Sequence, residues 1–161
     1  MIIPAQTLRR IKPVEPFCER MLHNGMTFGL GPAGYDVRIA ETVTIAAGRF
    51  ILASTVERFD MPNDILAQVC DKSTWARRGI AIQNTIIEPG WRGYVTLEIV
   101  YFGDTPIEIR AGDPIAQIIF FRLEEPTALP YAGRYQDQER GPQKARHADF
   151  DSILRRWDRA R

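Results

Sequence analysis

Turn-forming residues recur at short intervals along the whole chain. The 12 glycines and 11 prolines are spread through the sequence and are not gathered in a linker. Between them lie short segments in which apolar and polar residues alternate, a pattern typical of half-buried β-strands. With 161 residues, 45% of them hydrophobic, the chain has the size of one domain with its own core. We therefore expect a single domain built from many short strands.

The predicted strands are the segments 35–39, 43–45, 49–54, 65–70, 80–87, 94–101, 107–109 and 115–121. Before them, Leu8 to Leu22 is predicted to hold one or two short helices, because Pro13 and Pro16 interrupt the segment. About eight to eleven short strands separated by turns predict a mainly β fold of the sandwich or jelly-roll type.

The net charge and the two cysteines limit which partners and which cellular compartment fit this sequence. The net charge of +1 argues against a nucleic-acid binder, although a small anionic ligand needs only a few local cations. Cys18 and Cys70 lie far apart in sequence, and we expect both to be reduced thiols. The first residues do not have the pattern of a signal peptide, and no run approaches 18 apolar residues. We expect a cytoplasmic protein without a membrane or nucleic-acid partner.

Several well-known site motifs are missing from the sequence. It has no Cys-x-x-Cys pair, and His23 and His147 lie outside ligand spacing, so we expect no zinc site. It also has no Walker loop, no dinucleotide-binding Gly-rich motif and no nucleophile elbow.

The segment from Asp71 to Gly79 combines cations with hydroxyl groups directly after an apolar strand. Lysine, arginine and hydroxyl side chains are good partners for phosphate oxygens, so this segment is a candidate phosphate site. The alternative is a solvated helical turn that binds nothing.

The segment from Ile87 to Val100 contains a candidate acid–base residue. In the predicted strand, Tyr94, Thr96, Glu98 and Val100 would share one face. A carboxylate enclosed by apolar side chains holds its proton more strongly and can transfer protons near neutral pH. The alternative is a glutamate on the solvent face of the strand.

The chain beyond the last predicted strand divides into two parts. Residues 130–142 are polar and aromatic, which fits either a lid over a ligand or a disordered tail. Residues 144–161 form a basic extension with an apolar helical stripe at Phe150, Ile153, Leu154 and Trp157. We expect this C-terminal helix to dock on the protein body, with a neighbouring subunit or a nucleic-acid arm as alternatives.

Five motifs in order connect this chain with a known family: Gly34-Tyr35-Asp36-Val37-Arg38, Lys72 to Arg77, Ile87 to Glu98, Gly112-Asp113-Pro114-Ile115-Ala116-Gln117 and Tyr131 to Gln138. Together with Ile3-Pro4-Ala5-Gln6 they resemble the dCTP deaminase and dUTPase superfamily. The resemblance implies a distorted jelly-roll or β-barrel of the dUTPase-like type, with short N- and C-terminal helices. It implies a catalytic domain over residues 1–143, whose tail at 130–143 covers the nucleotide, followed by the extension over 144–161.

The resemblance also implies a homotrimer with active sites between subunits. A deoxynucleoside triphosphate would bind there with Mg²⁺ attached to its phosphates and no metal held by the protein alone. Ser73 and Arg77 match positions that hold phosphates and support the catalytic glutamate. Lys72 and Thr74 lie in the same phosphate-binding stretch.

Further positions match the base pocket and the tail of the family. Thr96 and Leu97 would flank the base, while Tyr131, Arg134 and Gln138 would cover the nucleotide. Arg134 is a departure, because the deaminases have lysine at this position.

Glu98 matches the catalytic glutamate of the deaminases, and its Thr-Leu-Glu context resembles theirs and not that of the dUTPases. The implied reaction converts dCTP to dUTP with release of ammonia, as part of pyrimidine deoxynucleotide biosynthesis. Glu98 would take a proton from water, hydroxide would attack C4, and the proton would pass toward N3.

Two departures leave the activity open between alternatives. Glu88 stands where both branches usually have aspartate, and the stretch from Gly79 to Glu88 is shorter than in bacterial deaminases. Gln83 and Asn84 would line the base pocket, and the Asn84 amide could read a pyrimidine edge. The alternatives are a dUTP diphosphatase, a bifunctional enzyme that makes dUMP from dCTP, and a non-catalytic nucleotide-binding relative. A modified cytosine as substrate and regulation by dTTP also stay open.

Overall fold

Strands make up most of the chain, and the computed structural model describes residues 1–146. The elements in chain order are α1 (Ala5–Ile11), β1 (Val14–Glu15), β2 (Met21–His23), β3 (Met26–Gly31), β4 (Gly34–Arg38), β5 (Val43–Ile45), β6 (Phe50–Asp60), β7 (Ile65–Asp71), α2 (Ser73–Ala76), β8 (Ile80–Ile82), β9 (Ile86–Ile87), β10 (Arg92–Tyr101), β11 (Ile107–Ile109) and β12 (Pro114–Arg122).

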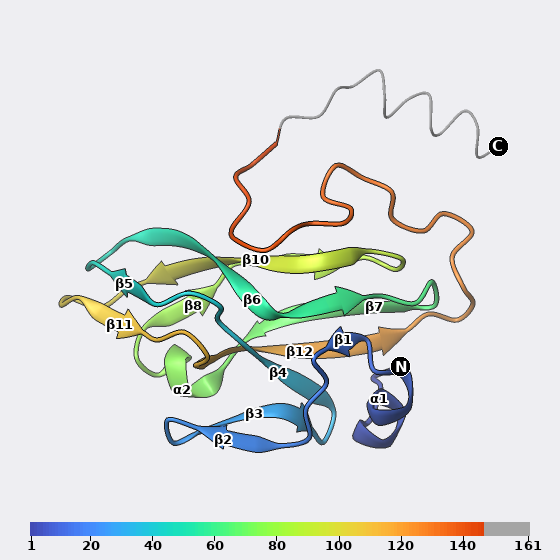
Figure 1. Cartoon of the computed structure of the whole chain (residues 1–161), viewed down its shortest axis with the longest axis horizontal. Coiled ribbons are helices and arrows are strands. Elements are labelled where there is room, and N and C mark those ends of the chain that lie inside the picture. The colour runs from blue at the N-terminus through green and yellow to red at the C-terminus, as the bar shows by residue number, and fades with distance from the viewer. Residues whose placement is uncertain (147–161) are drawn as a thin grey trace.

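Two larger sheets and one small one organise these strands. The larger sheets have the strand orders β2-β3-β4-β12-β7-β9 and β1-β6-β10-β8, and β11 pairs with β5 in a third. The long strands β6 and β10 lie above β12 and β4 in the view of Figure 1. Side chains from both larger sheets meet in one core, including Val37, Phe59, Leu97 and Phe120. This mainly β, curled architecture is the one predicted from the turn pattern.

The predicted strands are present, with two differences in extent. The segment 49–54 grows into the 11-residue β6. The segment 80–87 divides into β8 and β9, because the chain leaves β10 at residues 83–85.

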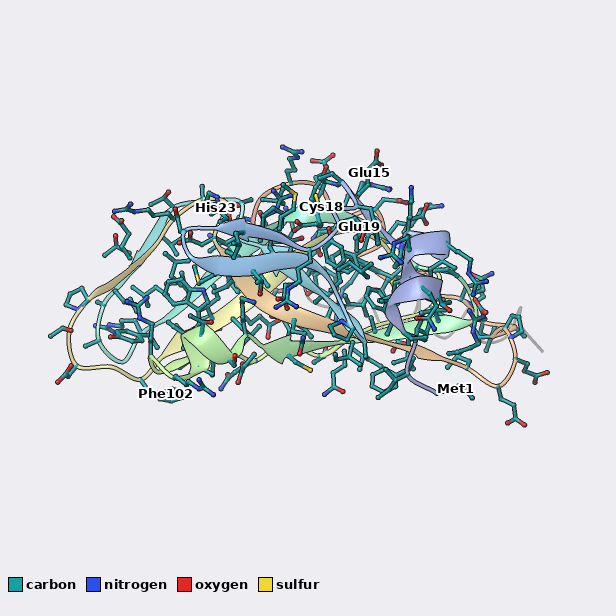
Figure 2. All side chains as sticks on the ribbon, turned by 90° about the horizontal axis from the view of Figure 1, so that it is seen from below. Met1, Glu15, Cys18, Glu19, His23 and Phe102 are labelled. Carbon is teal, nitrogen blue, oxygen red and sulfur yellow. The ribbon has the colours of Figure 1, made fainter. Side chains whose placement is uncertain are left out.

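The N-terminal region departs further from the prediction. Over residues 8–22, where one or two helices were expected, it has most of one short helix, α1, followed by β1 and the start of β2. The next strand, β3, lies where no element was predicted. The turn between β2 and β3 is Asn24-Gly25, with φ values of 48° and 74°. This dipeptide is a strong hairpin signal that the sequence already contained. Glu15 is the last residue of β1, and Cys18 and Glu19 lie on the segment that joins β1 to β2 (Figure 2).

A buried ion pair links the two larger sheets. Arg38 on β4 donates from Nε to Glu57 Oε1 on β6 at 2.8 Å, and its backbone N–H donates to Oε2 at 2.9 Å. The Glu57 side chain is completely buried, while that of Arg38 is 19% exposed. The Arg38 guanidinium also lies 4.6 Å from the centre of the Phe28 ring. Both oxygens of a core carboxylate are thereby satisfied.

Within residues 1–146, no helix is both long enough and apolar enough to cross a lipid bilayer. The predicted C-terminal helix lies, from residue 147 onward, outside the described residues. Both cysteines are free thiols, as predicted.

Candidate active site

A solvent-open cleft of about 660 Å³ lies between β10, its neighbouring strands and the C-terminal tail. This volume is within the usual range for small-molecule sites. Six of the residues predicted from the sequence line it: Asn84, Glu88, Thr96, Glu98, Tyr131 and Gln138. The structure therefore brings together residues that are up to 54 positions apart in the chain.

Glu98 lies on the cleft side of β10. Tyr94, Thr96, Glu98 and Val100 are all half-buried on one face, while the residues between them are buried in the core. The predicted shared face is thus confirmed. Within residues 1–146, no hydrogen bond or ion pair engages the Glu98 carboxylate, which leaves it free for water or a ligand.

Apolar side chains form one wall of the cleft that holds this carboxylate. Leu52 on β6 is the register partner of Glu98, and Phe50, Val69 and Trp91 line the same cleft. These residues were not predicted, because one sequence does not show which strands become neighbours of β10. An apolar wall suits the flat face of a nucleobase.

Residues 83 and 84 are hydrogen-bonded to the backbone of β10. The backbone N–H of Gln83 donates to the Glu98 carbonyl oxygen at 2.9 Å, and its own side chain is exposed outside the cleft lining. Asn84 Oδ1 accepts the backbone N–H of Glu98 at 2.9 Å, and Nδ2 donates to the Thr96 carbonyl at 2.6 Å. The Asn84 amide thus binds the backbone of β10, where the sequence predicted that it would face a base.

The tail packs along β10 and closes one side of the cleft, as Figure 1 shows for the segment that passes above this strand. The backbone N–H of Tyr94 donates to the Gln138 carbonyl at 3.0 Å, and Gln138 Nε2 donates to Thr96 Oγ1 at 2.5 Å. Trp91 Nε1 donates to the carbonyl of Tyr135 at 2.7 Å. A disordered tail is therefore the wrong alternative for residues 130–142.

Charged and aromatic groups secure the tail further. Arg92 donates to both oxygens of Asp137, at 2.9 and 3.1 Å, which lowers the pKa of that carboxyl. Tyr135 and Gln143 also line the cleft, and the sequence analysis missed both. Arg134 lies outside the lining, with its guanidinium 5.4 Å from the centre of the Tyr135 ring. In this arrangement Arg134 does not face the cleft as the resemblance implied.

We expect Gly93→Ala to separate the tail from β10. Gly93 has a φ of 139°, and a Cβ there would lie 2.6 Å from the backbone nitrogen of Gln138. Backbone cannot yield to such a contact without moving, so trypsin cleavage after Arg134 and Arg140 should accelerate roughly tenfold or more. Limited proteolysis followed by mass spectrometry measures this.

Gly48→Ala is the matched control for that experiment. Gly48 also has a positive φ, of 67°, but a Cβ there would meet nothing within 4 Å. It introduces backbone strain without a clash against the tail. Equal cleavage rates in Gly93→Ala and Gly48→Ala would contradict the docking described above.

The predicted phosphate-binding residues lie apart from the Glu98 cleft within one chain. Lys72 and Ser73 line a second cavity of about 270 Å³, while Thr74 and Arg77 are exposed on and beside α2. Lys72 is buried and its Nζ donates to Asp36 Oδ2 at 2.6 Å. In this chain Lys72 is therefore ion-paired with Asp36, and its predicted contact with a phosphate stays a prediction.

Leu97 is the remaining predicted residue outside the cleft. Its side chain is completely buried in the core, on the face of β10 opposite to Glu98. Period-two alternation requires this, since neighbours in a strand face opposite sides. The Leu97 side chain therefore does not line the cleft, and its place beside the base stays a prediction.

Comparison with known proteins identifies the family. A family model described as dCTP deaminase-like matches residues 32–123, more than half of the chain. The chain is 36% identical to the dCTP deaminase of Campylobacter fetus, over 78% of this chain and 86% of that protein. It is 32% identical to the dCTP deaminase of Pyrococcus horikoshii, over 87% of this chain and 94% of that protein.

Solved structures agree on the fold. The 2'-deoxycytidine 5'-triphosphate deaminase from Agrobacterium tumefaciens superposes with a TM-score of 0.60 at 19% identity, over 74% of this chain and 47% of that chain. The EIAV dUTPase superposes with a TM-score of 0.52 at 22% identity, over 63% of this chain and 84% of that chain. These likenesses confirm the predicted jelly-roll-type fold. On the strength of the family model and the curated relatives, the chain belongs to the dCTP deaminase-like family.

Proposed function

We propose that this protein deaminates dCTP to dUTP with Glu98 as the general acid and base. One observation carries the proposal: in a chain of the dCTP deaminase-like family, Glu98 presents a half-buried carboxylate to a ligand-sized cleft with an apolar wall. Release of ammonia from dCTP by the purified protein tests it.

The proposed reaction needs one water molecule and one carboxylate at the base. Glu98 takes a proton from water, and the resulting hydroxide attacks C4 of cytosine. Glu98 delivers this proton to N3, which keeps it. Glu98 then carries the proton of the new C4 hydroxyl to the exocyclic nitrogen, so that the C4–N bond breaks and ammonia leaves as the C4 carbonyl forms. The atoms balance as dCTP and water giving dUTP and ammonia. A positioned acid–base group of this kind typically contributes about 10²–10⁴-fold to the rate.

We also propose that the site is completed by a neighbouring chain in a homotrimer. Ser73 and Arg77 match the family's phosphate-binding positions, yet neither lines the Glu98 cleft within one chain. Since both side chains are exposed on or beside α2, a second copy could present them to that cleft. A cyclic trimer would then hold three identical sites between subunits.

Mixed trimers test this arrangement. We expect Glu98→Gln and Arg77→Ala each to be poorly active alone, the second through weaker triphosphate affinity. When the two chains are mixed one to one and reassembled, about one quarter of the sites combine an intact Arg77 with an intact Glu98 from its neighbour. Ammonia release should recover to about that fraction of wild-type.

The control is each variant reassembled with itself, which should recover nothing. Native mass spectrometry verifies that mixed trimers have formed. Mixed trimers without any recovered turnover would contradict a site shared between chains.

Mg²⁺ would arrive with the triphosphate. In the second cavity, the carboxylates of Asp36 and Asp71 line the same space as Ser73. Mg²⁺ is commonly bound by one or two carboxylates together with substrate phosphates. Asp36 is already paired with Lys72, and one oxygen of Asp71 accepts the N–H of Ile82, so we propose that the phosphates supply most of the ligands of this ion. When bound, it would neutralise part of the triphosphate charge. Among solved relatives in fold, a dUTPase from phage phi11 of S. aureus is described with a structural Mg(II) ion.

The dUTP diphosphatase alternative receives less support. The curated relatives at more than 30% identity are dCTP deaminases, whereas the similar dUTPase structures are below 25% identity and show only the fold. Glu88 lines the cleft at the position where the dUTPase motif has aspartate. We propose a cytoplasmic location, because the deoxynucleotide pool is found there. We also propose dTTP as a further nucleotide that could occupy the site.

A further inference from the structure

We infer that Asn84 is a positioning residue, which holds the backbone of Glu98 so that its carboxylate faces the cleft in one place. This inference rests on the proposed function, because it assigns a role in the same site. The observations that carry it are the two hydrogen bonds of the Asn84 amide and the path of the chain beside β10.

The path of the chain explains why a side chain is needed at this point. β8 pairs with β10 through Ile82↔Ile99, Ala81↔Val100 and Ile80↔Tyr101. One more bond follows, from the backbone N–H of Gln83 to the Glu98 carbonyl. The chain then turns away toward β9, which pairs with β7. Beyond that point, the ladder beside Thr96 and Glu98 has no further backbone partner from β8.

The Asn84 amide takes over the role of that missing partner. Its Oδ1 accepts the N–H of Glu98 at 2.9 Å, and its Nδ2 donates to the carbonyl of Thr96 at 2.6 Å. Residues 96 and 98 have the same parity, so these two backbone groups point to the same edge of β10. A carboxamide presents one acceptor and one donor at the right separation, much as a peptide group does. Its orientation follows from the partners, since reversing it would oppose two donors and two acceptors.

The backbone of Glu98 is therefore held from the β8 edge, and the paired strand β6 lies along the other edge of β10. On the other edge Glu98 is in register with Leu52 of β6. The carbonyl of Glu98 is fixed by Gln83 and its N–H by Asn84. A side chain that starts from a backbone fixed in this way has only its own torsions left to adjust. Displacement of a catalytic group by about 1 Å can cost about 10²-fold in rate.

Few other side chains could do the same. Alanine removes both bonds, and aspartate keeps the acceptor for the Glu98 N–H but loses the donor to Thr96. These two substitutions separate the two contacts. The Asn84 amide is hydrogen-bonded to the backbone of β10. Its replacement should therefore lower the turnover of dCTP more than the affinity for dCTP.

Amide hydrogen exchange, followed residue by residue by NMR on the whole chain, tests the contact itself. In Asn84→Ala we expect the Glu98 amide to exchange roughly tenfold faster or more, while Ile99 keeps its wild-type rate. In Asn84→Asp the Glu98 amide should stay protected, because an oxygen still accepts from it. Unchanged exchange at Glu98 in Asn84→Ala would overturn the inference, whatever the protein catalyses.

Steady-state kinetics with dCTP tests the positioning role. We expect Asn84→Ala to lower kcat by roughly 10- to 100-fold and to change KM by less than about threefold. Asn24→Gly is the control for lost stability alone, because it removes an amide hydrogen bond of 2.7 Å to Asp113 in the β2–β3 turn. Its kcat should stay at the wild-type value.

The exchange and kinetic results distinguish a failure of the positioning role from a failure of the proposed function. Faster exchange at Glu98 with an unchanged kcat would overturn the positioning role although the contact exists. A wild-type protein that releases no ammonia from dCTP would refute the proposed function, and positioning for that reaction would fall with it. The exchange result would then still show whether Asn84 holds the backbone of Glu98.

Discussion

Replacing Glu98 by glutamine is expected to lower the rate of ammonia release from dCTP by about 10²–10⁴-fold, the usual contribution of a positioned acid–base group. The amide has nearly the same size as the carboxylate but cannot take a proton from water. The apolar wall formed by Leu52, Phe50 and Trp91 remains in place, so nucleotide affinity should change little. Single-turnover ammonia assays and isothermal titration with dCTP and Mg²⁺ measure the two quantities separately.

A matched variant shows whether the loss is specific to the cleft. Glu108 on β11 is exposed, pairs only with Arg110 among the described residues, and does not line the cleft. Glu108→Gln should therefore leave both turnover and affinity unchanged. If Glu98→Gln retained most of the wild-type turnover, Glu98 would not be the acid–base residue.

Arg38→Ala is expected to destabilise the fold by about 3–5 kcal/mol, which is the usual cost of leaving one partner of a buried ion pair alone. The Glu57 carboxylate would keep its place in the core without the 2.8 Å contact to the guanidinium. Urea unfolding monitored by tryptophan fluorescence gives this free energy.

The loss should depend on pH in a definite direction. Burial raises the pKa of Glu57, and its hydrogen bonds to Arg38 act against that rise. Arg38→Ala removes the guanidinium's share of this opposing effect, while the backbone N–H of residue 38 still donates to the carboxylate. The pKa of Glu57 in the folded variant therefore rises further above that of the unfolded chain. A carboxyl group whose pKa is higher in the folded chain than in the unfolded chain lowers the stability as pH rises from the unfolded pKa to the folded pKa. Below the unfolded pKa this loss of stability is absent. The deficit of Arg38→Ala is therefore expected to be largest at neutral pH and to shrink toward acid pH.

Two further variants decide whether buried charge is the cause. Arg38→Met combined with Glu57→Gln removes both charges while an amide oxygen still accepts the backbone N–H of residue 38, so much of the stability should return. Arg110→Ala breaks an exposed pair with the same 2.8 Å contact and should change stability little. An equal loss in Arg38→Ala and Arg110→Ala would contradict this account.

Most of the fold could be predicted because strand alternation and turn residues are local signals. The segments that became β4, β5, β7, β10, β11 and β12 were placed within about two residues. The hairpin of β2 and β3 was not predicted, because Pro13 and Pro16 favoured an interpretation of residues 8–22 as interrupted helices. The dipeptide Asn24-Gly25 nevertheless marks a turn in the sequence. The division of β8 from β9 depends on which partner each strand finds, and one sequence does not show partners.

The candidate site was predictable to the extent that its residues lie on one strand or match one motif. Glu98 and Thr96 follow from alternation in β10. The contacts of Lys72 and Asn84 could not be predicted in this way, because each is made with a distant segment. Lys72 pairs with Asp36, and Asn84 bonds to the backbone of β10. Proximity of Arg77 to Glu98 depends on a second chain, and it stays a prediction.

The central claim is that this chain converts dCTP to dUTP and goes no further. Incubation of the full chain with dCTP and Mg²⁺ in one reaction, and with dUTP and Mg²⁺ in another, tests it directly. Ammonia and pyrophosphate are measured in both. The account predicts ammonia equal in amount to the dUTP formed from dCTP, and no pyrophosphate from either nucleotide. Pyrophosphate from dUTP, or nucleotide binding without ammonia from dCTP, would contradict it.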